Sequence, residues 1–417
     1  MKYVTRNIEK QLKDALDSSG AVFLRGIKAC GKTETALRFA KSSINLQENS
    51  RNKLLAEVSP SDALDGPTPR LVDEWQEVPN IWNNIKVEID KRKISKQFIL
   101  AGSSTLQDDI KIHSGAGRII TLDMSTLSWQ ELGYSNGSVS LATLLDSNTI
   151  KSTQNQTTLK SILRRLVVGG WPSLIGKSES SAITINRSYI DLLLSDDISR
   201  VSGVKRNRQK AEKILQSLAR NIATTVDIST IATDTVANTD SNVSRQATYD
   251  YLDDFNRLLI LVNQPAWNVH IRSSASLRVT PKRHLADPSL SCATLGLSSD
   301  SLFHDLNFAG FLFESQVFHD LSVYASQNDS SLSYYRDSFG NEVDIIVEKR
   351  DGSWAAFEVK LGDVELDLAS KKLLNFANNI DTKKSKAPSS LNIVTGTGLA
   401  YTRADGVNVL TLSVLGA

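Results

Sequence analysis

The chain has 417 residues, of which 40% are hydrophobic and 23% are charged, as is typical of a globular protein of roughly two to four domains. Its 48 Lys and Arg residues nearly balance its 46 Asp and Glu residues, which excludes a uniformly basic nucleic-acid coat protein and a strongly acidic protein. Its two cysteines, Cys30 and Cys292, are too few for a disulfide framework or a zinc cluster. No apolar run approaches the roughly 20 residues of a membrane-spanning helix, and the N-terminus lacks the apolar stretch of a signal peptide. We therefore expect a cytoplasmic protein with no membrane partner.

The first part of the chain alternates between strand and helix patterns. Apolar residues at helical spacing predict helices over residues 6–16 and 81–91, and a further helix over residues 33–41 follows a glycine-containing turn. Short apolar runs predict four strands, over residues 21–24, 71–72, 97–100 and 119–122. Strands that alternate with helices indicate an α/β fold on a parallel sheet.

The glycine-containing turn matches the pattern G-x-x-x-x-G-K-S/T and lies between the first predicted strand and a helix. In such a loop, backbone N–H groups surround a polyphosphate, and glycines adopt the dihedral angles that this requires. We expect Lys32 to contact the β- and γ-phosphates and the Thr33 hydroxyl to join the shell of a Mg²⁺ ion. The sequence therefore predicts ATP and Mg²⁺ as cofactors, held by the loop residues Gly26, Ile27, Lys28, Ala29, Cys30, Gly31, Lys32 and Thr33.

Two adjacent acids, Asp73 and Glu74, follow the second predicted strand. In P-loop enzymes an acid at this place holds Mg²⁺, and a neighbouring one polarises the attacking water. Adjacent acids are common on protein surfaces, but their position one element after the P-loop favours the catalytic interpretation. We predict Asp73 as a metal-side residue and Glu74 as the general base.

Residues 73–79, D-E-W-Q-E-V-P, resemble the D-E-x-Q-x-x-P signature of a prokaryotic AAA+-like family, the archaeal-type P-loop ATPases. Three further segments resemble motifs of that family: 100–104 (L-x-G-S-S), 114–118 (S-x-x-G-R) and 126–132 (P-L-S-F-x-E-L, with Thr126 in place of the proline).

The resemblance implies that Ser103 or Ser104 lies beside the γ-phosphate as a sensor. It also implies that Arg118 is an arginine finger, whose planar charge stabilises the transferring phosphoryl group of a neighbouring subunit. A finger of this kind requires a homo-oligomer. The alternative is that Arg118 pairs with a surface carboxylate of its own chain.

The middle of the chain is predominantly helical. Residues 135–158 are rich in Ser, Thr, Asn and Gln, which predicts a loop or domain junction. Helical patterns follow over residues 159–194, with an interruption at 169–172 that resembles the family's G-G-x-P turn, and over 210–222. Asp196-Asp197-Ile198 resembles the family's D-I step.

Residues 244–261 resemble the second and third elements of a winged helix, with Ser244 as a helix cap and with Tyr251, Leu252 and Leu258 facing a core. The side chains that would face a DNA groove are Arg245, Gln246 and Tyr249. The alternative is a winged helix used only as a lid.

Two basic clusters occur in the same region. The larger contains Arg200, Lys205, Arg206, Arg208, Lys210 and Lys213. The smaller is the run Lys282-Arg283-His284. Either cluster is a phosphate-binding surface or simply a solvated run of charges, and the sequence does not decide between these alternatives.

The C-terminal part combines a predicted helix over 303–324 with strands over 331–335, 343–347 and 354–359. Glu358 and Lys360 are two residues apart and therefore share one face of a strand. If Asp344 lies at the matching end of the adjacent strand, two carboxylates and an ammonium converge and can hold Mg²⁺ and activate water. Glu314 on the preceding helix would add another acidic ligand.

This pattern resembles the PD-(D/E)XK restriction-endonuclease-like fold, with a helix Glu, a strand Asp and an E-x-K triplet. The resemblance implies that Asp344, Glu358 and Lys360 are catalytic and that Glu314, Asp344 and Glu358 bind metal. The alternative is a solvent-facing hairpin whose Glu and Lys form an ion pair.

The sequence thus predicts an α/β protein with a P-loop AAA+-like ATPase core (1–135), a helical lid and linker (136–200), a winged-helix-like segment (201–285) and a restriction-endonuclease-like domain (286–417). One hypothesis is an ATP-hydrolysing enzyme that acts on DNA and cuts it. A second is a nucleotide-dependent switch with a non-cleaving C-terminal domain. A third is a regulator that reads a DNA sequence through residues 244–262.

Overall fold

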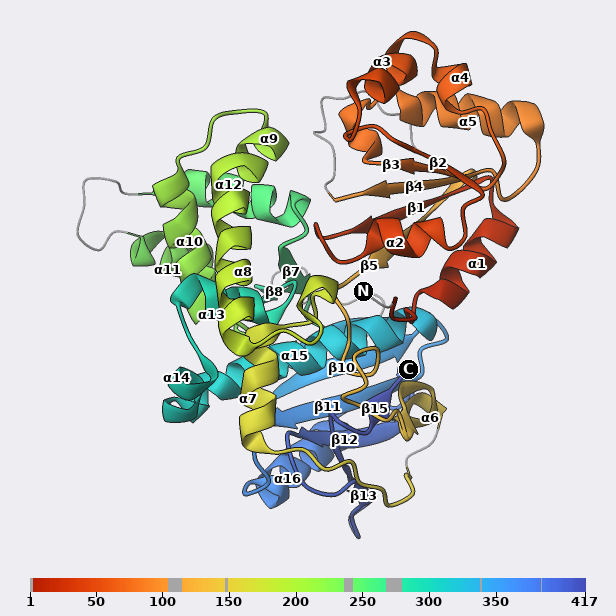
Figure 1. Ribbon diagram of the computed structural model, residues 1–417. Coiled ribbons are helices and arrows are strands. Elements are labelled where there is room, and N and C mark those ends of the chain that lie inside the picture. The colour runs from red at the N-terminus through yellow and green to blue at the C-terminus, as the bar shows by residue number, and fades with distance from the viewer. Residues whose placement is uncertain are drawn as a thin grey trace. The chain divides into compact units, whose positions relative to one another are not determined.

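The computed structural model describes residues 3–103, 115–146, 149–235, 243–267, 280–337, 340–383 and 385–417. The chain forms two compact units (Figure 1). Unit 1 contains Met1–Thr126, Asp196–Arg206 and Asp254–Ile260. Unit 2 contains Leu127–Ser195, Asn207–Asp253 and Leu261–Ala417.

Unit 1 is built on a five-stranded sheet in the order β2-β3-β4-β1-β5. Every neighbouring pair is parallel, so the carboxyl ends of all the strands meet at one edge. The strands are β1 (Ala21–Gly26), β2 (Ser42–Asn45), β3 (Arg70–Asp73), β4 (Phe98–Gly102) and β5 (Ile119–Met124). The predicted parallel sheet is confirmed, although β2 was not expected from the sequence.

Helices cover both faces of this sheet (Figure 1). They are α1 (Glu9–Ser18) and α2 (Lys32–Leu37) on one face, and α3 (Ser50–Val58), α4 (Pro60–Ala63) and α5 (Ile81–Arg92) on the other. The short 3-10 turn η1 (Trp75–Glu77) follows β3. Its Trp75 and the Trp82 of α5 pack edge-on against Phe23, with ring centroids 5.5 and 5.7 Å away. Helix α2 is shorter than the predicted 33–41.

The first half of unit 2 is helical, as expected. Its elements are β6 (Val139–Ser140), α6 (Leu141–Asp146), α7 (Leu159–Val168), η2 (Pro172–Leu174) and α8 (Glu179–Leu192). The π-helical turn η3 (Leu193–Asp197) follows, passes into unit 1 at Asp196 and continues as α9 (Ile198–Ser202). The predicted interruption after residue 168 is confirmed. A Cβ atom on Gly170 would lie 2.2 Å from the carbonyl oxygen of Leu127, so this close approach of two backbones requires glycine.

Three helices and a hairpin come next. The helices are α10 (Arg208–Arg220), α11 (Ile228–Asp234) and α12 (Arg245–Arg257), and the antiparallel hairpin joins β7 (Leu261–Gln264) to β8 (Lys282–Leu285). As predicted, the Ser244 hydroxyl accepts a hydrogen bond at the start of α12, from the N–H of Ala247. Tyr251, Leu252 and Leu258 are buried.

A six-stranded mixed sheet in the order β13-β14-β12-β11-β10-β9 forms the rest of unit 2. Its strands are β9 (Ser330–Arg336), β10 (Glu342–Lys349), β11 (Trp354–Lys360), β12 (Ser390–Thr395), β13 (Tyr401–Thr402) and β14 (Asn408–Thr411), and a separate short strand, β15 (Leu415–Gly416), pairs with β6. The remaining helices are α13 (Pro288–Leu295), α14 (Ser299–His304), α15 (Leu306–Gln327) and α16 (Leu366–Asn378).

Helices α15 and α16 cover the two faces of this sheet (Figure 1), and each face contributes to a buried core cluster. On one face, Phe313 and Val317 of α15 belong to the same core cluster as Phe357. On the other, Phe376 of α16 packs against Trp354. This two-sided burial explains the apolar character of β10 and β11. Within the described residues, no helix has the length and apolarity to cross a membrane.

Candidate functional site

The P-loop connects β1 to α2 in unit 1. Lys32, the first residue of α2, is buried, and its Nζ atom donates hydrogen bonds to the carbonyl oxygens of Gly26 and Ile27 at 2.9 and 3.0 Å. Gly31 has a φ of 102°, a backbone conformation that glycine adopts without strain. The loop therefore encloses the lysine that the sequence predicts for phosphate binding.

Thr33 and Asp73 lie together, as the sequence predicts for a metal-side pair. The Thr33 hydroxyl donates to Asp73 Oδ2 at 3.0 Å, and Asn45 Nδ2 donates to the same oxygen at 3.1 Å. Burial raises the pKa of Asp73, although the hydrogen bond from Thr33 opposes this effect. Asn45 was missed because its strand, β2, has a single buried apolar residue, Ile44.

Glu74 and Ser103 follow β3 and β4 and so lie at the same carboxyl-end edge as the P-loop. Glu74 has a positive φ of 50° and accepts a hydrogen bond from the Gln76 side chain. Ser103 is buried, and Ser104 lies outside the described residues. From the sequence, Gln76 was identified only as one position of the D-E-x-Q-x-x-P motif. In the structure its side-chain amide donates the hydrogen bond to Glu74, the proposed base.

Arg118 lies at the other edge of the sheet. It immediately precedes β5, whose amino end is far along the strand direction from the P-loop edge. Its Nε atom donates to Asp90 Oδ1 at 2.6 Å, and the two side chains are 40% and 54% exposed. Within one chain, Arg118 thus forms a surface ion pair, which was the alternative to an arginine finger. Its role as a finger toward a neighbouring subunit stays a prediction.

A second polar network in unit 1 begins at the P-loop residue Lys28. Its Nζ atom lies 3.2 Å from Asp197 Oδ2. Asp197 also pairs with Arg200 at 3.2 Å, and Arg200 reaches Glu77 at 3.3 Å. The Asp197 side chain is 12% exposed, so the P-loop is tied to a residue that the family resemblance identified only as a sequence step.

The larger basic cluster is largely engaged in contacts within each unit. Besides Arg200, Arg206 pairs with Asp254 at 2.6 Å in unit 1. In unit 2, Arg208 pairs with Asp191, and Lys213 Nζ donates to the carbonyl oxygen of Thr235. These pairs weaken the interpretation of the cluster as a phosphate-binding surface.

The smaller basic run belongs to neither class that the sequence suggested. Lys282, Arg283 and His284 form strand β8 and are 2%, 6% and 2% exposed. They are therefore neither a solvated run nor a phosphate-binding surface. His284 stacks on Phe318 with ring centroids 4.1 Å apart, and its two ring nitrogens contact Ser315 and Gln264.

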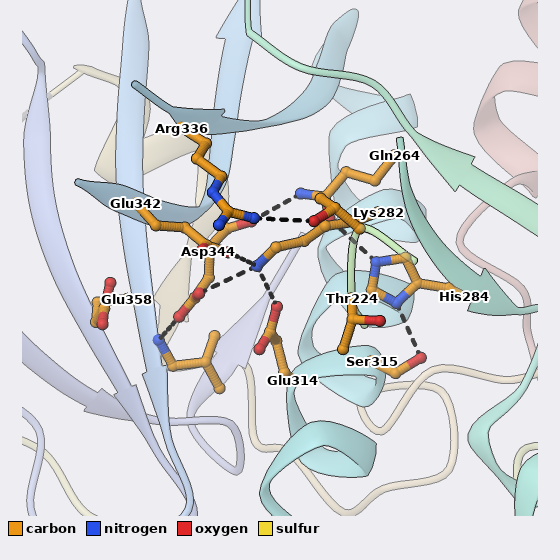
Figure 2. A network of polar contacts seen from close by, with 12 residues as sticks. Thr224, Gln264, Lys282, His284, Glu314, Ser315, Arg336, Glu342, Asp344 and Glu358 are labelled. Carbon is orange, nitrogen blue, oxygen red and sulfur yellow. Dashed lines mark hydrogen bonds and ion pairs between the residues drawn. The ribbon is translucent and has the colours of Figure 1, made fainter. Parts of the chain in front are cut away.

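The C-terminal acids gather around Lys282 (Figure 2). Its Nζ atom lies 2.8 Å from Glu314 Oε1, 2.7 Å from Glu342 Oε1 and 3.2 Å from Asp344 Oδ1. The pairing of β9 with β10 shifts register between Val343 and Ile346; such irregularities redirect side chains, and Asp344 lies within this one. The sequence predicted Glu314 and Asp344 but missed Glu342 and Lys282.

The charges of this cluster shift its pKa values. Burial alone would lower the pKa of Lys282, but Asp344, Glu314 and Glu342 raise it well above its usual value. Burial and the charge of Asp344 raise the pKa of Glu314 to about 8. Burial would also raise the pKa of Asp344, yet Lys282 and the Val359 N–H lower it. The surrounding acids therefore favour the charged form of Lys282.

Glu358 is separate from the Lys282 contacts (Figure 2). Its side chain is 1% exposed, and Oε1 accepts from Lys360 at 3.1 Å and from Lys372 at 2.8 Å. Among the described residues, its other oxygen, Oε2, is buried without a hydrogen-bond partner. The predicted pairing of Glu358 with Lys360 on one face is confirmed, but a solvent-facing hairpin is wrong because the strand is buried. Lys372 is a third member of this group.

The predicted metal site does not form from these residues as they lie. Within the described ranges, no group of three or more His, Cys, Asp or Glu side chains is arranged to hold a metal ion. A cleft of about 700 Å³ adjoins the acids, and Glu314, Lys360 and Phe311 are among its lining residues. Glu314 and Asp344 thus both contact Lys282. Glu358 instead contacts two other lysines, Lys360 and Lys372.

Comparison with known families finds three matching segments along the chain. Residues 18–133 match an AAA domain. Residues 159–301 and 309–415 match two domains of unknown function, DUF8612 and DUF4143. The first segment is therefore similar to nucleotide-binding ATPase domains, as its parallel sheet and P-loop indicate. The descriptions of the other two name neither a winged helix nor a nuclease.

Two curated relatives are similar over most of the chain. They are the uncharacterized proteins Rv2008c of Mycobacterium tuberculosis and Mb2031c of Mycobacterium bovis. Each is 22% identical over 360 residues, which cover 85% of this chain and 73% of the relative. The similarity extends well beyond the AAA match, so the relatives share more of the chain than the ATPase-like segment.

Proposed function

We propose that the protein is a nucleotide-dependent switch, in which unit 1 binds and hydrolyses ATP with Mg²⁺ and the C-terminal domain binds a partner without cutting it. The observation that carries the ATPase part is the contact between Thr33 and Asp73 beside a complete P-loop. A hydroxyl and a carboxylate 3.0 Å apart supply the oxygen ligands that Mg²⁺ prefers.

The residues of unit 1 divide the work of phosphoryl transfer. Lys32 exchanges its bonds to loop carbonyls for bonds to phosphate oxygens, and the loop N–H groups hold the same phosphates. Bound Mg²⁺ neutralises charge on the phosphates. Once the Glu74 carboxylate is released from its hydrogen bond with Gln76, it orients the attacking water and accepts a proton from that water. Ser103 contacts the terminal phosphate.

Glu74→Gln tests this assignment because it keeps the size and hydrogen-bonding capacity of the side chain but removes the base. We expect this variant to bind ATP as the unmodified protein does. Its rate of phosphate release should be lower by a factor of roughly 100 or more. Glu48→Gln, an exposed change outside the proposed site, is the matched control. Full turnover by Glu74→Gln would reject Glu74 as the base.

The non-cleaving part of the proposal rests on Lys282. Glu314 and Asp344, two of the three expected metal ligands, each give an oxygen to its ammonium. The ion pairs of Arg200, Arg206 and Arg208 also favour a switch over an enzyme that grips a nucleic-acid backbone through this cluster.

We also propose that DNA binds to the segment that resembles a winged helix, which precedes the C-terminal domain. Its element order, three helices followed by a hairpin, supports the resemblance, and Arg245, Gln246 and Tyr249 are exposed on α12. Fluorescence anisotropy with duplexes of several sequences tests this. Binding that Arg245→Ala weakens supports the proposal, and a lack of sequence preference removes the regulator hypothesis.

A nuclease is the second candidate, favoured by the buried Glu358 oxygen that has no hydrogen-bond partner among the described residues and by the adjoining cleft. Single-turnover assays with duplex, single-stranded and branched DNA, in Mg²⁺ or Mn²⁺, decide between the candidates. If the unmodified chain cuts DNA and both Asp344→Ala and Glu358→Ala abolish the cutting, the nuclease hypothesis replaces the switch hypothesis. We expect no cutting.

A further inference from the structure

The ammonium of Lys282 is enclosed by carboxylates from different elements. Lys282 lies on β8, Glu314 on α15, and Glu342 and Asp344 on β10. The three distances from Nζ are 2.8, 2.7 and 3.2 Å, and the lysine side chain is 3% exposed. Figure 2 shows the lysine pointing into the space between Glu314, Glu342 and Asp344.

Acidic side chains that lie close together repel one another when they are charged, unless a cation lies among them. In many proteins that cation is Ca²⁺, Mg²⁺ or Mn²⁺, which bind carboxylate oxygens. Here a lysine is present, and its three N–H donors match the three oxygens it contacts. A metal ion that used the same oxygens would have to displace an ammonium whose side chain is only 3% exposed.

The hairpin that carries Lys282 is held in place by a second contact. Gln264 on β7 donates from Nε2 to the carbonyl oxygens of Asp344 and Ser333, at 2.8 and 2.9 Å. Lys282 and Gln264 thus approach Asp344 from the two strands of one hairpin. This double attachment fixes the ammonium at the acids, which a mobile surface lysine would not achieve.

We propose that Lys282 takes the place of a divalent cation in the C-terminal domain, so that this acidic cluster is complete without metal. The inference rests on the non-cleaving part of the proposed function and is independent of ATP hydrolysis by unit 1. It also gives the cluster a role, which is to lock the β7–β8 hairpin, from the segment that matches DUF8612, onto the sheet that matches DUF4143.

Removal of the lysine charge tests the proposal, because it leaves the side chains of Glu314, Glu342 and Asp344 without the cation that they contact. The full-length chain carries Asp73→Asn in all samples, which removes the metal-side acid of unit 1, and nucleotide is omitted. The probe is Tb³⁺, read by its sensitised emission and by the melting temperature. Tyr334, whose ring centroid is 5.8 Å from Lys282 Nζ, is placed to sensitise a lanthanide that takes the ammonium's position.

We expect Lys282→Met to bind Tb³⁺ at least tenfold more tightly than the parent chain. We also expect it to melt at a lower temperature in EDTA and to recover with Ca²⁺ or Tb³⁺. Lys372→Met is the matched control, since Lys372 pairs with the single carboxylate of Glu358, and it should gain no affinity. A Lys282→Met chain that folds but gains none would overturn the proposal.

A second measurement holds even if Lys282→Met does not fold. In the parent chain, Asp344→Asn and Glu342→Gln should leave Tb³⁺ affinity unchanged, because the proposal says that no metal uses these oxygens. If the parent chain binds Tb³⁺ and either change abolishes that binding, the cluster binds a metal beside Lys282 and the proposal is wrong. Cleavage and ATP turnover are measured separately, so failure here leaves the ATPase assignment intact.

Discussion

The Thr33 hydroxyl donates a 3.0 Å hydrogen bond to Asp73 Oδ2 across 40 residues of sequence. The hydroxyl belongs to α2, which follows β1, and the carboxylate to β3. They meet because all parallel strands of this sheet end at one edge. A P-loop that lacked this partner would have a phosphate cradle without a metal-side acid. The pair is therefore the structural basis of the ATPase proposal.

Asp73→Asn tests the acid of this pair. The amide is the same size and still accepts from Thr33, but it loses the charge that a divalent ion requires. We expect ATP turnover to fall by roughly 100-fold or more, with a higher Mg²⁺ concentration needed for half-maximal rate. Asp90→Asn, at the exposed Arg118 pair, should change turnover less than about twofold. Equal losses in both variants would contradict the role of Asp73.

The ion pair between Lys28 and Asp197 predicts competition with a bound phosphate for this P-loop cation. The pair is 3.2 Å long, and Lys28 is half-exposed, so its net contribution is about 0.5–1 kcal/mol. We expect Asp197→Ala to bind ATP roughly two- to fivefold more tightly. Isothermal titration measures this. Asp196→Ala, the exposed neighbour, should leave the affinity unchanged, and weaker binding by Asp197→Ala would refute the competition.

Arg118 provides a separate test of self-association. Because it lies at the amino end of β5, Arg118→Ala should not alter ATP affinity. If Arg118 completes the site of a neighbouring subunit, the variant loses turnover only at protein concentrations where the unmodified chain self-associates. Turnover and sedimentation measured over the same concentration range check this. A loss that is independent of concentration would argue against a finger.

His284 makes stability depend on pH. Burial and the charge of Lys282 lower the pKa of His284 from 6.5 to about 3, so the unfolded chain binds a proton more readily than the folded chain between these values. The contribution is fully present above pH 6.5 and is lost as pH falls toward 3, at up to about 1.4 kcal/mol per pH unit.

Urea unfolding at pH 7.5 and pH 5 checks this expectation. His284→Gln should lose less stability between the two pH values than the unmodified protein does. His304→Gln, at an exposed histidine, should lose as much as the unmodified protein. A His284→Gln chain with the full pH dependence would show that another group titrates.

The features that the sequence predicted well are local. The P-loop, the acids after β3 and Ser103 are each defined by a few consecutive residues next to an apolar strand, so their placement follows from the parallel sheet. Strand β2 was missed because Ser42–Asn45 contains one buried apolar residue and therefore has no strand-like alternation.

Lys282 shows why the C-terminal site was harder to predict. In the sequence it begins a basic run, and such runs are usually solvated. Its burial depends on Glu314, Glu342 and Asp344, which are 32 to 62 residues away. The sequence brought Glu358 and Lys360 together through strand periodicity, but it contained no signal for a lysine delivered from another hairpin.

The most direct measurement of the ATPase claim is phosphate release from ATP by the unmodified chain and by Lys32→Ala, each with and without Mg²⁺. Lys32 is enclosed by the loop carbonyls of Gly26 and Ile27, so its replacement removes the phosphate-binding charge and leaves the sheet intact. We predict Mg²⁺-dependent release by the unmodified chain and none above background by Lys32→Ala. Equal release by both chains, or no ATP binding by the unmodified chain, would contradict the proposed function.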